Sequence, residues 1–111
     1  MTSVKYYKDT QHEYITEFLN SISPKQQSKV IRIIHTIEEY GLTSANPHLK
    51  KIFNTPFWEI RILGKDNIRI LYVSVILDEI ILIHGFIKKT QKTPTKEIKI
   101  AMKRYQQLID N

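Results

Sequence analysis

The sequence predicts an α+β fold in a single domain that spans residues 1–111, and three observations support this prediction. Two segments with apolar residues at helical spacing come first, in residues 10–41. Three segments with the apolar patterns of strands follow in residues 57–87, and residues 93–109 return to helical spacing. A chain of 111 residues is long enough for one domain with its own core, and too short for two.

The first third of the chain predicts a strand and then a helical hairpin. Residues 4–7 are short and aromatic, as expected of a strand. Thr10 and Glu13 have the spacing of a capping box, and an apolar stripe follows it (Ile15, Phe18, Leu19 and Ile22). A second helix begins at Ser23 and Pro24, and Gly41 can end it with a positive φ. With almost no linker between them, the two helices should fold back on each other.

The remainder predicts an antiparallel β-meander and a last helix. Residues 43–56 have no periodicity and are expected to form a loop. Strands are expected at residues 57–63, 68–76 and 80–87, with turns at 64–67 and 77–79. In the first of them Trp58, Ile60 and Ile62 should face the core, opposite the polar Glu59 and Arg61. The last helix should be capped by Thr93, begin at Pro94 and bury one face (Ile98, Ala101, Met102, Tyr105 and Ile109).

Charge is concentrated near the C-terminus. The formal net charge is +6, and the segment from Lys88 to Arg104 holds seven basic residues against Glu97 alone. A basic balance favours an anionic partner, which is nucleic acid, an acidic protein or a membrane surface, although a solvated helix face is an equal alternative. No stretch approaches the roughly 20 apolar residues of a membrane span, and no apolar segment follows the N-terminus as in a signal peptide, so a cytoplasmic protein is expected.

Metal and cofactor chemistry have little support in the sequence. The chain has no cysteine, which excludes disulfides and thiolate ligands. Its four histidines form no pair at a spacing of three or four residues, and its three isolated glycines form no phosphate-binding loop. We therefore expect no metal and no cofactor.

A cluster of cations on the expected strands is the strongest functional signal. Arg61 and Arg69 lie on the first two meander strands, and a run of lysines ends and follows the third (Lys88, Lys89 and Lys92). Converging cations repel one another unless an anion joins them, and a phosphate suits the arginine fork. Fixed cations also stabilise the extra negative charge that develops when a ribose 2′-OH attacks the neighbouring phosphate. Because DNA lacks this hydroxyl, such a reaction is restricted to RNA. Alternatively, Arg61 pairs with Glu59 across a strand.

The general base is left open at this point. His84 is in phase with Lys88 on the third strand, but a lone histidine in an apolar strand is more often a core residue. His48 could reach across from the basic loop. Lys88 or Lys89 could act if neighbouring cations lower its pKa.

Three segments in the second half of the chain resemble the HigB-like toxins of the RelE/ParE superfamily. They are Phe-Trp-Glu-Ile-Arg at 57–61, Ile-Arg-Ile-Leu-Tyr at 68–72, and His-Gly-Phe-Ile-Lys-Lys-Thr-Gln-Lys-Thr-Pro at 84–94. The resemblance implies a compact RelE-like α+β toxin that enters the ribosomal A site, cleaves mRNA and is neutralised by a cognate antitoxin. Carried over by position, Arg61 and Arg69 bind and polarise the scissile phosphate, and Lys88 or Lys89 is the basic residue after the last strand. The chain departs from RelE-type ribonucleases because no tyrosine follows that strand closely.

The expected site therefore has two parts. The catalytic candidates are Arg61, Arg69, Lys88, Lys89 and His84. The RNA-binding candidates are the other lysines of the basic segments (Lys50, Lys51, Lys92, Lys96, Lys99 and Lys103). Two alternatives stay open, a ParE-like toxin that inhibits gyrase and a non-catalytic nucleic-acid-binding module.

Overall fold

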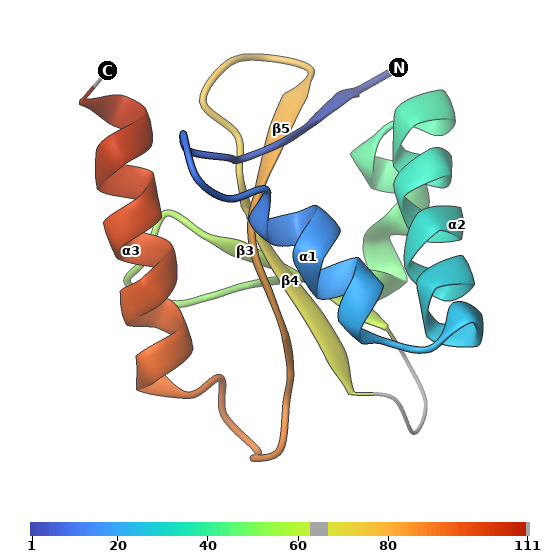
Figure 1. The fold of residues 1–111 in the computed structure, drawn as a ribbon. Helices are drawn as coiled ribbons and strands as arrows, with labels where there is room; N and C mark the ends of the chain where they lie inside the picture. The colour runs from blue at the N-terminus through green and yellow to red at the C-terminus, as the bar shows by residue number, and fades with distance from the viewer. Residues whose placement is uncertain (63–66, 111) are drawn as a thin grey trace.

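The computed structural model describes residues 1–62 and 67–110, and it contains one mixed sheet with helices on both faces (Figure 1). The elements occur in the order β1 (Ser3–Tyr6), α1 (Tyr14–Ser21), α2 (Pro24–Tyr40), the 3₁₀-helix η1 (Leu42–His48), β2 (Leu49–Lys51), β3 (Trp58–Ile62), β4 (Ile68–Val73), β5 (Glu79–Ile87) and α3 (Thr95–Ile109). The α+β class is confirmed, together with the N-terminal strand, the helical hairpin, the meander and the C-terminal helix expected of a RelE-like arrangement. No described helix is long and apolar enough to cross a membrane.

The sheet extends the predicted meander by one strand on each side. Its strand order is β1-β5-β4-β3-β2, and β3, β4 and β5 pair antiparallel as expected. The N-terminal strand β1 pairs parallel with β5, which makes β5 an internal strand, as its apolar pattern predicts. The expected loop at 43–56 is wrong, because it contains η1 and the edge strand β2. The strand β2 has only three residues, which is too short for an apolar alternation to be recognised, and it is held by its backbone pairing with β3.

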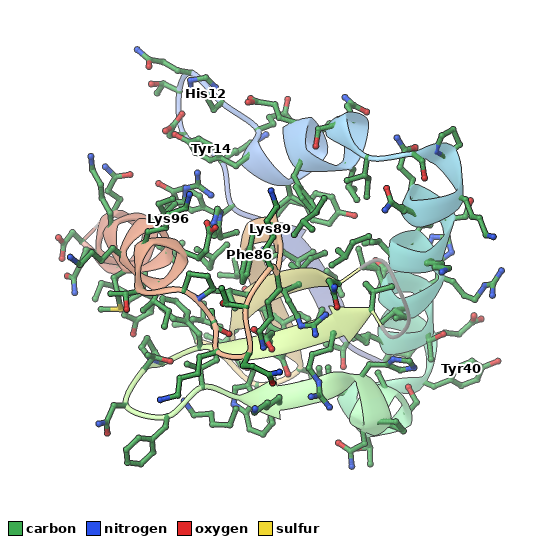
Figure 2. All side chains as sticks on the ribbon, turned by 90° about the horizontal axis from the view of Figure 1, so that it is seen from below. His12, Tyr14, Tyr40, Phe86, Lys89 and Lys96 are labelled. Atoms are coloured by element: carbon green, nitrogen blue, oxygen red, sulfur yellow. The ribbon has the colours of Figure 1, made fainter. Side chains whose placement is uncertain are left out.

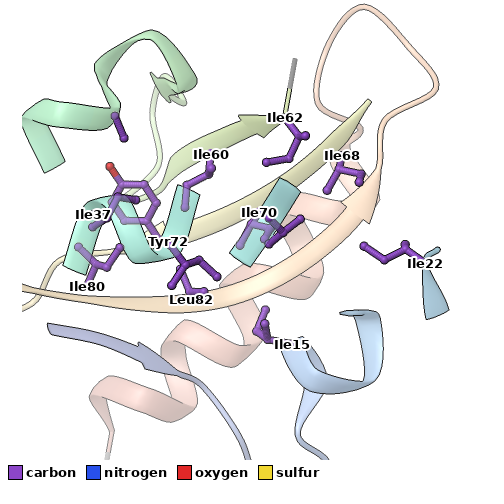
Figure 3. Packing of buried hydrophobic residues seen from close by; sticks show 13 residues of the cluster. Ile15, Ile22, Ile37, Ile60, Ile62, Ile68, Ile70, Tyr72, Ile80 and Leu82 are labelled. Carbon is purple, nitrogen blue, oxygen red and sulfur yellow. The ribbon is translucent and has the colours of Figure 1, made fainter. Parts of the chain in front are cut away.

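The helices divide the core into two clusters, one on each face of the sheet. The larger cluster lies under α1 and α2 and is rich in isoleucine (Figure 3). The second cluster joins Leu71, Ile83 and Phe86 of the sheet to Ala101 of α3. The predicted division of β3 into a core face and a polar face is wrong. Glu59 is 1% exposed because the second face is also covered, whereas Trp58, on the face of Ile60 and Ile62, is 40% exposed.

Two of the predicted helix signals are present and two are not. The Ser23 capping box and the end of α2 at Gly41, with φ at 86°, are confirmed. The Thr10 box is wrong: Asp9 accepts the backbone N–H groups of Gln11 and His12, so α1 begins only at Tyr14. The Thr93 cap is also wrong, because its hydroxyl donates to the Glu59 carboxylate instead.

Three smaller predictions need correction or are not addressed. The strand predicted at 68–76 ends at Val73, and the aliphatic residues that follow it are exposed. Ile109 is 47% exposed, and Leu108 packs on the second cluster in its place. Most of the turn predicted at 64–67, and the end of the preceding strand at 63, lie outside the described residues.

Candidate functional site

Five cations from four segments of the chain line one open depression of about 640 Å³. Arg61 on β3 and Arg69 on β4 are direct register partners, so their side chains lie on the same face of the sheet. Lys88 and Lys89 follow β5 immediately, and Lys50 comes from β2. We call these five residues the cation cluster. Figure 2 views the molecule from the end where the segment after β5, with Lys89, lies. The predicted convergence of Arg61, Arg69, Lys88 and Lys89 is thus present, and Asn67, Thr90 and Gln91 complete the lining.

The Nε atoms of the two arginines make no hydrogen bond within the described structure, although that of Arg69 is ion-paired. The Nε atoms of Arg61 and Arg69 are buried, and neither has a hydrogen-bond partner among the residues that the structure describes. Arg69 is the more enclosed, with a side chain only 13% exposed, and one terminal nitrogen donates to the Ile68 carbonyl at 2.9 Å. Burial lowers the pKa of Arg69, and Glu59 opposes this effect. Because both Nε atoms are closed off from solvent, an anion in the depression would be held by the positive charge of the two guanidinium groups and not by these atoms.

A buried carboxylate lies against the cluster from below. Glu59 Oε1 is 3.6 Å from Arg69 Nε, and Glu59 Oε2 accepts a hydrogen bond from Thr93 Oγ1 at 2.6 Å. Glu59 is in phase with Arg61 along β3, but its ion pair is with Arg69 on the neighbouring strand. The apolar and polar alternation of residues 57–63 does not predict this contact. It depends on the segment before α3, which covers the second face of the sheet and lies far away in the sequence.

Lys88 differs from the other lysines of the cluster in its environment. Burial, followed by the charges of Arg69, Lys50 and Arg61, lowers the Lys88 pKa, while Glu59 acts in the opposite direction. A lower pKa increases the fraction of neutral amine near neutral pH, which is the form that accepts a proton. The direction of the shift agrees with the expectation from the sequence, although burial and not the neighbouring cations is its largest cause.

His84 lies apart from the cluster. It does not line the depression, and four residues of extended chain separate it from Lys88, about 13 Å at 3.3 Å per residue. Its Nε2 is 2.8 Å from Glu97 Oε1, and its Nδ1 is 3.1 Å from a terminal nitrogen of Arg104. Since Arg104 can only donate, Nδ1 accepts and Nε2–H donates, so the imidazole is neutral. Burial lowers the His84 pKa, in agreement with this state.

Arg104 joins this second group of contacts, which the sequence did not reveal. It donates to the Ile83 carbonyl at 3.0 Å, and its guanidinium lies 3.6 Å from the centre of the Tyr14 ring. Tyr14 in turn donates to Asp9 at 2.5 Å. These contacts connect α3 to β5 and to the segment before α1. Arg104 therefore has a structural role, unlike the exposed lysines of the same basic segment.

The other basic candidates fall into two groups. Lys51 turns to its own loop and donates to the backbone carbonyls of Ile52, Thr55 and Phe57. The remaining candidates are exposed, on the segment before α3 or on α3 itself (Lys92, Lys96, Lys99 and Lys103). His48, from the same basic segment as Lys50, contacts the Arg61 carbonyl through Nδ1 at 3.3 Å. Among the described residues, no group of three metal-ligating side chains gathers.

Comparison with known proteins identifies the family. Residues 17–106 match the family model described as Phage derived protein Gp49-like (DUF891). No curated protein matches the chain. The solution structure of the conserved hypothetical protein HP0894 from Helicobacter pylori is similar to 77% of this chain and 92% of that one, with 23% identity and a TM-score of 0.43. Since the family match covers most of the chain, this protein belongs to the Gp49-like family, which is a family of RelE/HigB-like toxins.

Proposed function

We propose that this protein is the toxin component of a type II toxin–antitoxin system and a ribosome-dependent endoribonuclease that inhibits translation by cleaving mRNA. Membership of a RelE/HigB-like toxin family supports the toxin assignment. The cation cluster supports the nuclease assignment, because it offers an anion site of the size and charge that a phosphodiester requires.

The observation that carries the proposal is the pair of neighbouring arginines that line one depression. Arg61 and Arg69 lie side by side in the register of β3 and β4 with their Nε atoms buried and without hydrogen-bond partners in the described structure. A stable fold has no use for two neighbouring guanidinium groups in this state, because unsatisfied buried donors and like charges both cost free energy. A phosphate group accepts from both and neutralises their repulsion.

Cleavage in this site needs no cofactor. The ribose 2′-oxygen attacks the adjacent phosphorus and gives up its proton, and the bond from phosphorus to the 5′-oxygen breaks as that oxygen takes up a proton. The products are a 2′,3′-cyclic phosphate and a 5′-hydroxyl. Arg61 and Arg69 stabilise the negative charge that accumulates on the phosphorane, as preorganised donors do in other enzymes. Because the nucleophile is the 2′-OH, DNA is not a substrate.

Lys88 is the best-placed residue for proton transfer, and Lys89 contributes charge from the exposed side. The lowered pKa of Lys88 favours this role, and its position next to Arg69 in the same depression places it near the reacting group. His84 is less suited, since both of its ring nitrogens already have partners. Its catalytic role stays a prediction that the geometry does not favour.

The partners follow from the same proposal. The exposed lysines on and before α3, together with Lys50, extend the positive surface beyond the depression and contact the backbone of mRNA in the ribosome. A cognate antitoxin neutralises the toxin in the cytoplasm by covering or distorting this basic surface.

Primer extension on mRNA tests the proposal. Purified protein is incubated with ribosomes and a defined mRNA, and the new 3′ ends are examined for a 2′,3′-cyclic phosphate. We expect cleavage by the parent protein and none by a folded Arg61→Ala/Arg69→Ala variant that still binds ribosomes. Intact mRNA with inhibited DNA gyrase would favour a ParE-like toxin instead, and intact mRNA with RNA binding alone would favour a non-catalytic module.

A further inference from the structure

Glu59 links the three segments that supply the catalytic cations. It lies on β3 two residues before Arg61, its Oε1 faces Arg69 on β4, and its Oε2 accepts from Thr93. Thr93 ends the segment that begins with Lys88, so this hydrogen bond holds the basic segment against the sheet. One carboxylate thus contacts both the Arg69 side chain of the cation cluster and the segment that follows Lys88 and Lys89.

Stability of the fold does not explain a charge at this position. Glu59 is 1% exposed, and its cross-strand neighbour Leu71 belongs to the apolar cluster under α3. Burying a carboxylate costs free energy, and an apolar residue of similar volume in place of a buried ion pair is often neutral or stabilising. The Glu59 carboxylate, whose two oxygens contact different groups, therefore has a role other than packing in the core.

We propose that Glu59 is a positioning residue of the cation cluster, holding Arg69 and the Lys88–Thr93 segment in the one arrangement that grips a scissile phosphodiester. This inference rests on the proposed nuclease function. Glu59 does not itself touch RNA, because its side chain is closed off from solvent and both of its oxygens face protein groups. Its charge also keeps the cluster assembled before the phosphate arrives, since Glu59 is the group that opposes the loss of charge at both Arg69 and Lys88.

Glu59→Gln removes the charge that faces Arg69, and comparison with Thr93→Val separates positioning from simple electrostatics. The amide keeps the size of the side chain and can still accept from Thr93, but the negative charge is lost. We expect kcat for ribosome-dependent cleavage to fall about tenfold or more, as small misplacements of catalytic groups do. Affinity for RNA should not fall, because the cluster has gained one unit of net positive charge. A merely electrostatic role would lower kcat here but leave Thr93→Val, which keeps the Glu59 charge, at the parental rate. A merely structural role would lower the melting temperature, kcat and RNA affinity together.

A second variant guards against a folding failure of the first. Thr93→Val removes only the hydroxyl that donates to Glu59 and is expected to show the same split, lower kcat with unchanged RNA affinity. The matched controls are Glu97→Gln, a half-buried carboxylate that faces His84 instead, and Thr95→Val on the exposed start of α3. Both controls should cleave at the parental rate.

A measurement on the free protein separates failure of this inference from failure of the proposed function. The Lys88 ammonium is titrated by NMR in the parent, Glu59→Gln and Glu97→Gln proteins. We expect its titration to move to lower pH in Glu59→Gln only. If the parent protein cleaves no mRNA but Lys88 responds in this way, the nuclease proposal fails and the contact of Glu59 with the cluster stands. The inference is overturned if the folded Glu59→Gln and Thr93→Val proteins cleave at the parental rate, or if Lys88 titrates alike in all three proteins.

Discussion

Replacing Arg69 by alanine should lower cleavage far more than it lowers stability. The change removes a guanidinium of the cation cluster whose side chain is 13% exposed. Loss of one preorganised donor to a developing anion costs about 10²-fold in kcat. This factor corresponds to about 2.7 kcal/mol of transition-state stabilisation.

The same change also has a cost in the folded state. Arg69 is the ion-pair partner of the buried Glu59, and its removal leaves that carboxylate with the Thr93 hydroxyl. A buried polar group that loses a partner costs about 1–3 kcal/mol. For a domain of this size each kcal/mol lowers the melting temperature by about 4 °C, so cleavage must be measured well below the melting temperature of the variant. On a solvent-facing strand surface without this ion pair, the same substitution would cost little stability.

Arg104→Ala is the matched control for this experiment. Arg104 is half-buried, donates to the Ile83 carbonyl and lies over the Tyr14 ring, far from the depression that holds the cluster. It should lose a similar amount of stability, measured by urea unfolding, while cleavage measured by primer extension stays near the parental rate. The reasoning is refuted if Arg69→Ala is folded and cleaves at the parental rate, or if both variants lose activity in proportion to their loss of stability.

Three further predictions address the fold, its pH dependence and RNA binding. Burial lowers the His84 pKa in the folded protein, so the unfolded chain binds a proton more readily and the free energy of unfolding should fall as the pH drops below about 6.5. His84→Gln should weaken this pH dependence in urea unfolding, and an unchanged pH dependence would contradict the assignment. Gly85→Ala places a Cβ 2.5 Å from the Phe18 ring and should destabilise the protein by about 1–3 kcal/mol in the same assay, whereas an unaltered midpoint would mean that α1 shifts freely. Charge reversal on α3 should reduce the slope of log affinity against log salt for single-stranded RNA by about 2, at about 0.7 per phosphate contact, and an unchanged slope would make this helix face merely solvated. The three reversed residues are Lys96, Lys99 and Lys103.

The sequence by itself was sufficient for the fold class and for the convergence of the strand cations with the lysines after β5. The alternation in β4 placed Arg69 on the face opposite Ile68 and Ile70, and antiparallel pairing of neighbouring strands allowed Arg61 and Arg69 to converge, as the register confirms. The run of basic residues after a strand likewise had to lie at one end of the sheet. Periodicity and strand direction are local properties, and both can be read from a single segment.

The tertiary structure alone decided which polar residues are buried and which groups they contact. Glu59 read as a solvent-facing residue and Thr93 as a helix cap, yet they meet across 34 positions of the sequence because α3 and the segment before it close over the second face of the sheet. His84 likewise became a partner of Glu97 and Arg104 when the same helix docked. Burial and long-range hydrogen bonds depend on what lies above a strand, and no pattern within the strand records it.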